Sequence, residues 1–352
     1  MAAGDKSSRR EFLGTLSAGV AVAGTLTSAS EATAQGAASL KIVDFHNHFM
    51  GSGWTLTNLA NVPPPARPAW EKINANLQSE SALLSSVESA GIAARVINTP
   101  TAFIEDADGK APPDSHQRIN DQMAALCSKN SGKLYGLATV DAFSGDNAAR
   151  ELTRAVRELK LRGVFVESAS PRRDLLLGDK ETRPMLKAAA DLGVPVFVHP
   201  QTDPQLHKRF SRTGRIGLRL ARGTINNAAL INMLESGAFD EAPKLQMVVT
   251  TLALGGLMLA GGFGDGSRIR SDAPALTRRH VYVDTMGINP VTVRAAIDLL
   301  GVDHVLMGTD WPIVVEKSVP ERLQKAFAHS GLTAAEQQMI ASGNALKLLG
   351  VS

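Results

Sequence analysis

The chain has 352 residues, of which 44% are hydrophobic and 20% are charged, a composition typical of globular proteins and not of disordered or fibrous ones. Its 37 basic and 34 acidic residues leave a formal net charge of +3, which argues against a nucleic-acid-binding protein with a basic face. A single cysteine, Cys127, excludes disulfides within the chain and cysteine-rich zinc or iron–sulfur sites.

The first 34 residues have the three parts of an export signal. A charged start contains Arg9 and Arg10, a weakly apolar run extends from Phe12 to Leu26, and small residues end at Ala34. The paired arginines favour the twin-arginine type, and the apolar run is too short and mild for the alternative, a membrane-spanning helix. We therefore expect residues 1–34 to direct export by the twin-arginine machinery and then to be removed. Residues 35–352 would then form a periplasmic, single-domain protein.

Strand-like runs alternate with amphipathic segments along the rest of the chain, which predicts parallel strands joined by crossover helices. Eight such units close a (β/α)8 TIM barrel, an α/β fold. An open doubly wound sheet is the alternative, but no Gly-rich dinucleotide turn follows the first strand. The predicted strands are Lys41–Phe49, Ala94–Pro100, Lys133–Ala142, Gly163–Ser168, Val194–Pro200, Lys244–Leu252, His280–Gly287 and His304–Pro312. The predicted helices include Glu71–Ala90, Asp114–Lys129, Asn147–Leu161, Glu181–Leu192 and Val291–Leu300.

Two connections are longer than a regular barrel needs, so we expect a distorted one. The first, Gly51–Trp70, follows the first strand and contains Trp54, and the second, Gln201–Thr224, follows the fifth strand and is rich in arginine. Long loops at the carboxyl ends of barrel strands lie where such enzymes bind their substrates.

Metal-ligating residue types stand at the ends of three predicted strands. His46 and His48 end the first strand, and alternation places both imidazoles on one side of it. His199 closes the fifth strand and Asp310 the eighth. Because the carboxyl ends of all barrel strands meet at one face, these four side chains are predicted to bind a divalent ion. His280 and His304 begin strands instead, and are expected at the opposite, stabilising end.

In this arrangement the chain resembles the amidohydrolase superfamily, and more narrowly its amidohydrolase-2 branch, which contains amino-carboxymuconate-semialdehyde decarboxylase. The resemblance rests on Val43–His48, on the fifth unit ending in Gly193–Pro200, on Gly308–Pro312 and on the closing Gly343–Ala345, and it covers residues 41–350. It implies one divalent ion, expected to be zinc, held by His46, His48 and His199. Asp310 would be a further ligand or the base that takes a proton from metal-bound water.

One departure from the branch bears on the reaction. Its decarboxylases generally carry a further histidine at the end of strand six, whereas this chain has Thr250 and Thr251 ahead of Gly255–Gly256. We therefore expect a hydrolase that opens an anionic lactone of the muconolactone or pyrone type, with Asp310 as base, like the lactonases of the superfamily. A non-oxidative decarboxylase of an aromatic or muconate-type acid and a non-catalytic binding barrel are the alternatives.

Arginines in the predicted loops favour a small anionic organic substrate, because guanidinium groups bind carboxylate and sulfonate oxygens in pairs. The expected contacts are Arg172 after strand four, with Arg209 and His207 after strand five. Trp54 and Trp311 are predicted to line the pocket, with core packing as the alternative for both. The sequence leaves a homo-oligomer open.

Three further charged positions have two readings each. Glu167, at the end of strand four, would bridge a second ion or orient a neighbouring arginine or histidine. Asp284, at the end of strand seven, would orient ligands or pair with an arginine. Arg222 shares a helical spacing with Arg215 and Arg219, and a solvated or interface face is the expected role for all three.

Overall fold

The computed structural model describes residues 40–57, 59, 62, 64–106, 110–262, 272–315 and 318–351. The predicted export signal of residues 1–34 therefore lies outside the described residues. Contacts divide the chain into Met1–Ser39 and Leu40–Ser352, and the fold below is that of the second unit. Within the described part of the chain, no helix is long and apolar enough to cross a bilayer.

Every predicted strand region forms a strand in the structure. The third is interrupted at Leu137, which divides it into β3 and β4, and a short antiparallel pair, β6 and β7, follows the fourth. The strands are β1 Val43–His48, β2 Ala94–Asn98, β3 Leu134–Gly136, β4 Ala138–Thr139, β5 Val164–Glu167, β6 Ala169–Ser170, β7 Leu175–Leu176, β8 Val196–His199, β9 Met247–Val249, β10 Val281–Asp284 and β11 Val305–Leu306.

The parallel strands close into a barrel. One sheet has the order β1-β2-β3 and the other β11-β10-β9-β8-β5-β4, and the β3–β4 segment belongs to both. The Leu137 N–H donates to the Ile97 carbonyl of the first sheet, while the Ala138 N–H donates to the Gly163 carbonyl of the second. The barrel closes between β1 and the segment that follows β11. There the Phe45 N–H donates to the Met307 carbonyl over 2.8 Å, and the His48 N–H donates to the Trp311 carbonyl over 2.8 Å. The predicted TIM barrel is confirmed.

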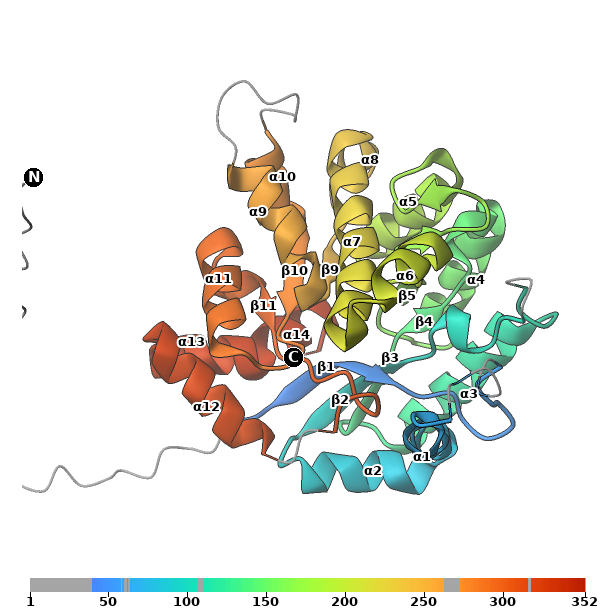
Figure 1. The fold of residues 1–352 in the computed structure, drawn as a ribbon, viewed down its shortest axis with the longest axis horizontal. Coiled ribbons are helices and arrows are strands. Elements are labelled where there is room, and N and C mark those ends of the chain that lie inside the picture. The colour runs from blue at the N-terminus through green and yellow to red at the C-terminus, as the bar shows by residue number, and fades with distance from the viewer. Residues whose placement is uncertain are drawn as a thin grey trace, which may run out of the picture. The chain divides into compact units, whose positions relative to one another are not determined.

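Helices surround the strands (Figure 1), and apolar side chains fill the layer between them. The predicted helix Glu71–Ala90 is two helices, because Ser79 adopts an extended backbone and its side chain caps the second one by accepting from the Ala82 N–H. The helices are α1 Arg67–Gln78, α2 Glu80–Ser89, α3 Ser115–Lys129, α4 Asp146–Arg157, α5 Arg183–Leu192, α6 Pro204–Ser211, α7 Gly214–Glu235, α8 Ala238–Glu241, α9 Leu254–Gly262, α10 Ala273–His280, α11 Pro290–Leu300, α12 Val319–Ser330, α13 Ala334–Gln338 and α14 Asn344–Leu348.

The connection after the fifth barrel strand differs from the sequence prediction. Residues 201–224 were expected as a long loop, but they contain α6 and the first half of the 22-residue α7. Asp203 starts α6, since its side chain accepts from the Leu206 N–H and Pro204 fits the first helical turn. The arginines of this region therefore lie on helices, and the faces of those helices decide which of them reach the site.

Candidate metal centre

A β-bulge in β1 turns both of its histidines into the barrel. Val43 and Phe45 belong to the apolar cluster inside the barrel. Asp44 pairs with Arg95 of β2, but Asn47 pairs with Ile97, so β1 has one extra residue between the two pairs. As a result His46 follows Phe45 to the inside, and its ring lies 5.1 Å from that of His48. The predicted placement of the two imidazoles on one side is confirmed.

Three histidines converge above a floor of phenylalanine rings. The candidate ligand atoms of His46, His48 and His199 all lie within 4.8 Å of one another, and all three residues are buried. The ring of His46 lies 4.9 Å from that of Phe197, and the ring of His199 lies 5.2 Å from that of Phe165. Apolar rings beneath the cluster keep water from that side and strengthen electrostatic interactions within it.

Each imidazole is oriented by a partner on its Nδ1 atom. The partner is Asp284 Oδ2 for His46 at 2.6 Å, Asn98 Oδ1 for His48 at 2.8 Å and Glu167 Oε2 for His199 at 3.3 Å. When Nδ1–H donates to these oxygens, the lone pair of each Nε2 remains available to a cation, as in metal-binding histidines. Asp284 and Glu167 thus orient histidines, which was one of the two roles expected for each.

Asp310 faces the Nε2 atoms of His46 and His48 from the segment that follows β11, and not from the strand itself as predicted. Its Oδ1 lies 3.1 Å from His48 Nε2 and 3.5 Å from His46 Nε2. The backbone of Asp310 has a φ of 73°, a left-handed conformation that is uncommon for a residue with a side chain, and its N–H donates to the His46 carbonyl. Burial acts to raise the pKa of the carboxyl group, but His46, His48 and Arg222 outweigh it and hold the pKa below its usual range.

The donor set fits a divalent cation. His46 Nε2, His48 Nε2 and Asp310 Oδ1 are buried without a hydrogen-bond partner, which is costly for polar atoms. Imidazole nitrogens with one carboxylate oxygen suit zinc, manganese and similar ions. Within the part of the chain that the structure describes, these three histidines are the group with the spacing of a metal site.

The electrostatics favour neutral imidazoles at two of the three positions. Burial, Arg222 and the two other histidines hold the pKa of His199 well below its usual range, and burial lowers that of His48. For His46, burial is outweighed by Asp284 and Asp310, so its pKa is raised. Burial raises the pKa of Glu167 to about 8, against the opposing charge of Arg222. A neutral imidazole is the form that binds a metal.

The sequence matches the amidohydrolase family over residues 43–351, which is most of the chain. The chain belongs to the amidohydrolase family. It is 22% identical over 293 residues to the 2-amino-3-carboxymuconate-6-semialdehyde decarboxylase of Dictyostelium discoideum, a match that covers 80% of this chain and 79% of that protein.

Solved structures of two decarboxylases resemble this amidohydrolase in fold. A 2,6-dihydroxybenzoate decarboxylase in complex with 2,6-dihydroxybenzoate has a TM-score of 0.74 at 20% identity, covering 89% of this chain and 100% of that one. The dihydroxybenzoic acid decarboxylase of Polaromonas sp. JS666, with bound manganese and the inhibitor 2-nitroresorcinol, has a TM-score of 0.74 at 20% identity, covering 88% of this chain and 97% of that one. At this identity the two likenesses establish the barrel fold.

A buried ion pair behind the amidohydrolase site holds the ends of the first and eighth strands together. The Asp44 carboxylate accepts from Arg95 Nη1, from the Thr309 N–H at 3.0 Å and from the Thr309 hydroxyl at 2.6 Å. It also accepts from the His46 N–H at 3.2 Å. Because Asp44 precedes His46 and Thr309 precedes Asp310, this network fixes two of the candidate ligands relative to each other.

Trp311 belongs to the packing around this network and not to a substrate wall as predicted. Its ring lies under the Arg95 guanidinium, 5.3 Å from centroid to carbon, and the residue is part of the apolar layer between barrel and helices. Trp54 is likewise buried, among Met50, Leu56 and their neighbours. The Trp54 indole N–H donates to Gln122 Oε1 over 2.9 Å. For both tryptophans the alternative of core packing describes the structure.

The predicted basic contacts lie on the surface. Arg172 is exposed in the turn after β6, and His207 and Arg209 are exposed on α6. With Lys208 and Arg212, Arg209 lines an open hollow of about 420 Å³. The structure does not place these residues at the histidine cluster. Their contact with a substrate stays a prediction.

Two residues near the cluster were missed as site residues. Arg222, expected on a solvated or interface face, is half-buried and places its Nη2 atom 3.2 Å from His199 Nε2. Phe103 lies in a turn after β2, and its ring centroid is 5.8 Å from that of His48, so it covers one side of the histidine cluster. The helical spacing of Arg222 with Arg215 and Arg219 was recognised, but its burial differs from that of these two exposed residues.

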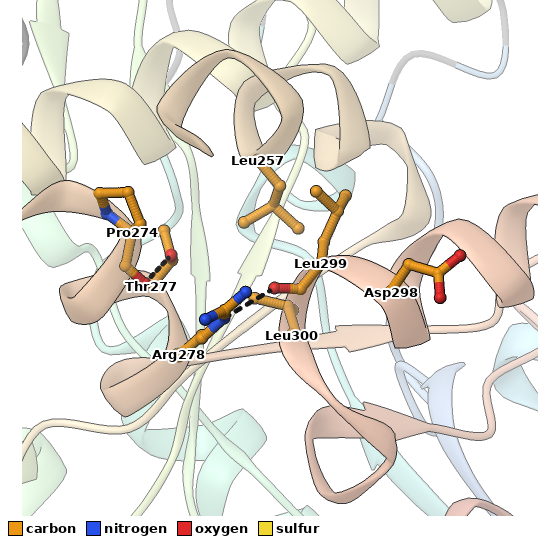
Figure 2. A pocket seen from close by; sticks show the side chains of 7 residues that line it. All are labelled: Leu257, Pro274, Thr277, Arg278, Asp298, Leu299 and Leu300. Carbon is orange, nitrogen blue, oxygen red and sulfur yellow. Dashed lines mark hydrogen bonds between the residues drawn. The ribbon is translucent and has the colours of Figure 1, made fainter. Parts of the chain in front are cut away.

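A second hollow, of about 100 Å³, lies between α10 and α11 (Figure 2). Its charged groups are already partnered: Arg278 Nε donates to the Leu299 carbonyl over 3.4 Å, and Asp298 pairs with Arg294. In Figure 2 the Asp298 carboxylate points away from Arg278. The histidine cluster, with its unpartnered buried atoms, is therefore the better candidate site.

Proposed function

We propose that this protein is a metal-dependent decarboxylase of an aromatic or muconate-type carboxylic acid. The observation that carries the proposal is that ligand atoms of His46, His48 and His199 lie within 4.8 Å of one another, with Asp310 Oδ1 3.1 Å from His48 Nε2 and 3.5 Å from His46 Nε2. The reactions of the relatives support it, since those named above are decarboxylases of such acids. The lactone hydrolase that the missing histidine of strand six suggested thus becomes the second candidate.

His46, His48, His199 and Asp310 would hold the ion. When bound, a divalent cation supplies positive charge that binds substrate oxygens and stabilises negative charge as it develops. Zinc was predicted from the sequence, whereas the Polaromonas decarboxylase was solved with manganese. Both ions are compatible with nitrogen and oxygen ligands, so metal analysis of the purified protein decides between them.

Asp310 would handle the proton. Because its pKa is below the usual range, it is ionised near neutral pH and able to accept the proton of a substrate hydroxyl. It would then deliver that proton to the ring carbon that bears the carboxylate. The C–H bond forms there, the bond to the carboxyl carbon breaks with its electron pair returning to the ring, and carbon dioxide leaves. A proton from solvent restores the hydroxyl.

The remaining residues of the site would orient and shield. Asp284 Oδ1 accepts from the Thr251 N–H at 2.9 Å and from the Met286 N–H at 3.1 Å, so its other oxygen is held against His46. Phe103 and the ring of Phe165 form apolar surfaces next to His48. An aromatic ring fits against such surfaces, and the exclusion of water favours release of neutral carbon dioxide over a charged carboxylate.

The test is a screen of acids and lactones against protein loaded with zinc or manganese. Release of carbon dioxide from hydroxybenzoates or muconate-type acids is the expected result. Ring opening of muconolactones or pyrone acids, read as loss of ring absorbance without carbon dioxide, would instead support the hydrolase, with Asp310 as its base. Absence of a stoichiometric metal and of both reactions would favour the non-catalytic barrel.

We also propose that residues 1–34 direct export and that residues 35–352 act as one domain in the periplasm. The support is the sequence pattern around Arg9 and Arg10. Fractionation of cells that express the full chain tests this. We expect the processed protein in the periplasm, and replacement of both arginines by lysine should retain the precursor in the cytoplasm. Export that persists in this variant would contradict the twin-arginine assignment.

A further inference from the structure

Arg222 contacts a histidine nitrogen that a bound metal ion would also use. Its Nη2 lies 3.2 Å from His199 Nε2, the nitrogen that a bound ion would occupy. A lone pair serves either a guanidinium donor or a metal, so loading the site would remove this acceptor from Arg222. The half-buried guanidinium would then need another acceptor for its donors, because arginine stays protonated.

Two carboxyl groups of the described residues interact with Arg222, and both have other partners or another role. The charge of Arg222 opposes the rise that burial causes in the pKa of Glu167 and helps to hold the pKa of Asp310 low, so Arg222 lies near both carboxyl groups. Glu167, however, is engaged by His199 Nδ1 at 3.3 Å and by the Ala102 N–H at 3.4 Å. Asp310 faces the ion. An anion that enters with the substrate would offer an acceptor whose charge is opposite to that of Arg222.

The backbone of Arg222 is held firmly in this position. Its neighbours Ala221 and Gly223 are buried, and a Cβ on Gly223 would lie 3.3 Å from the Leu252 carbonyl, so α7 packs closely on the turn after β9. One turn further, Asn226 Nδ2 donates to the Thr250 hydroxyl over 2.8 Å. Thr250 and Thr251 are the positions at which this chain lacks the histidine of strand six. Arg222 thus projects from α7 beside that end of the barrel.

We infer that Arg222 binds the carboxylate of the substrate beside the histidine cluster. This inference rests on the proposed decarboxylase function. The substrate class is then an acid whose carboxylate is recognised by a guanidinium from the helix after the fifth barrel strand. An arginine at this position binds a carboxylate through two parallel N–H···O contacts, which lysine does not reproduce.

The first experiment compares ligands that differ by the carboxylate alone. Manganese-loaded wild type, Arg222→Met, Arg222→Lys and the control Arg219→Met are titrated calorimetrically with 2,6-dihydroxybenzoate and with resorcinol. Arg219 is exposed on the same helix, so the control removes the same charge away from the cluster. We expect Arg222→Met to weaken binding of the acid about tenfold or more, with lysine intermediate and resorcinol within about twofold. Arg219→Met should bind both like wild type.

Equal losses for the two ligands in Arg222→Met, or no loss at all, would overturn the inference, since a merely structural role does not depend on the carboxylate. Failure of wild type to bind 2,6-dihydroxybenzoate would overturn it as well. Acid binding that depends on Arg222 without release of carbon dioxide from any acid would refute the decarboxylase proposal and leave Arg222 as the anion-binding residue.

A second measurement uses the metal alone. In metal-free protein, Arg222→Met removes a cation that competes for His199 Nε2, and manganese should bind several-fold more tightly than in wild type. Weaker manganese binding would show that Arg222 supports the ligand cluster itself, contrary to the inference. Thermal unfolding followed by circular dichroism shows that each variant used is folded.

Discussion

The two ends of the barrel carry buried or half-buried histidines in two different settings. At the amino ends of the strands, His280 and His304 place Nδ1 against the backbone carbonyls of Leu245 and Val281, each at 2.8 Å. Their rings stack on aromatic rings, His280 on Phe239 at 4.5 Å and His304 on Tyr282 at 4.3 Å. These imidazoles are satisfied by local packing.

At the carboxyl ends, by contrast, His46, His48 and His199 meet edge to face, and each Nδ1 is held by a side-chain oxygen. Two of the three Nε2 atoms are unpartnered. The contrast separates a structural histidine from a ligand: the former is satisfied by backbone and stacking, whereas the latter is oriented by side chains and left with a free lone pair.

The largest difference in metal content and activity is expected between variants that replace one histidine at each end of the barrel. His48→Ala should lose most of its bound metal. Its activity should fall by more than about 100-fold, because removal of a group that only orients a ligand already costs up to that much. The matched variant His304→Ala should keep its metal content and activity and lose about 1–2 kcal/mol of unfolding free energy. Metal analysis and chemical denaturation measure the two outcomes. Loss of metal in both variants would remove the distinction between the ends.

Asp310→Asn separates the chemical role of the carboxylate from its role as a ligand. The amide keeps the shape and one oxygen, so the three imidazoles should retain much of the metal. Turnover should fall by about 10²–10⁴, because the amide does not accept and deliver the proton. The rate of carbon dioxide release and the metal content are measured on the same sample. A near-normal rate would refute the proton-transfer role.

Asp284→Asn probes the orientation of His46. The substitution removes the negative charge that raises the pKa of His46. The one amide oxygen cannot accept both from His46 Nδ1–H and from the Thr251 and Met286 N–H groups, so the amide nitrogen opposes a donor on one side. Metal affinity should fall about 10- to 100-fold with the fold intact. Competition with a chelator gives the affinity. An unchanged affinity would mean that Asp284 is only a strand-end cap.

The smallest expected effect comes from crowding behind the cluster. A Cβ at Gly308 would lie 2.9 Å from the Cβ of His46 and 3.0 Å from that of Asp284. Gly308→Ala should therefore displace His46, with about 1–3 kcal/mol lost in stability and a several-fold loss of metal affinity. Gly350→Ala, where a Cβ would meet nothing within 4 Å, tests glycine replacement alone, although its φ of 61° adds strain. Equal loss of metal affinity in both would exclude the crowding explanation.

The barrel and its four candidate ligands could be predicted from the sequence, because apolar strand-like runs and the polar residues that follow them are recognisable there. The same rule gave Glu167 and Asp284 an orienting role as one of two alternatives, and it applies to Asn98 as well, since all three are the last residue of a strand. Asn98 was missed because asparagine was not considered as a partner for a ligand. The β-bulge in β1 was not predictable, as it depends on pairing with β2.

Arg222 was missed for a different physical reason. Its position at the site depends on where α7 begins and on how its small residues pack against the turn after β9, both of which are set by tertiary contacts. Arg209 of α6 and Arg212 after it are the same residue type, but both are exposed. Residue type and spacing therefore did not distinguish the arginine near His199 from those on the surface.

The central claim is that a divalent ion binds among His46, His48, His199 and Asp310. Diffraction from crystals of manganese-loaded protein, with data collected near the manganese absorption edge, tests it most directly. An anomalous peak within about 2.0–2.3 Å of the three Nε2 atoms and an Asp310 oxygen is the predicted result. A peak elsewhere in the barrel, or none at stoichiometric loading, would contradict the account.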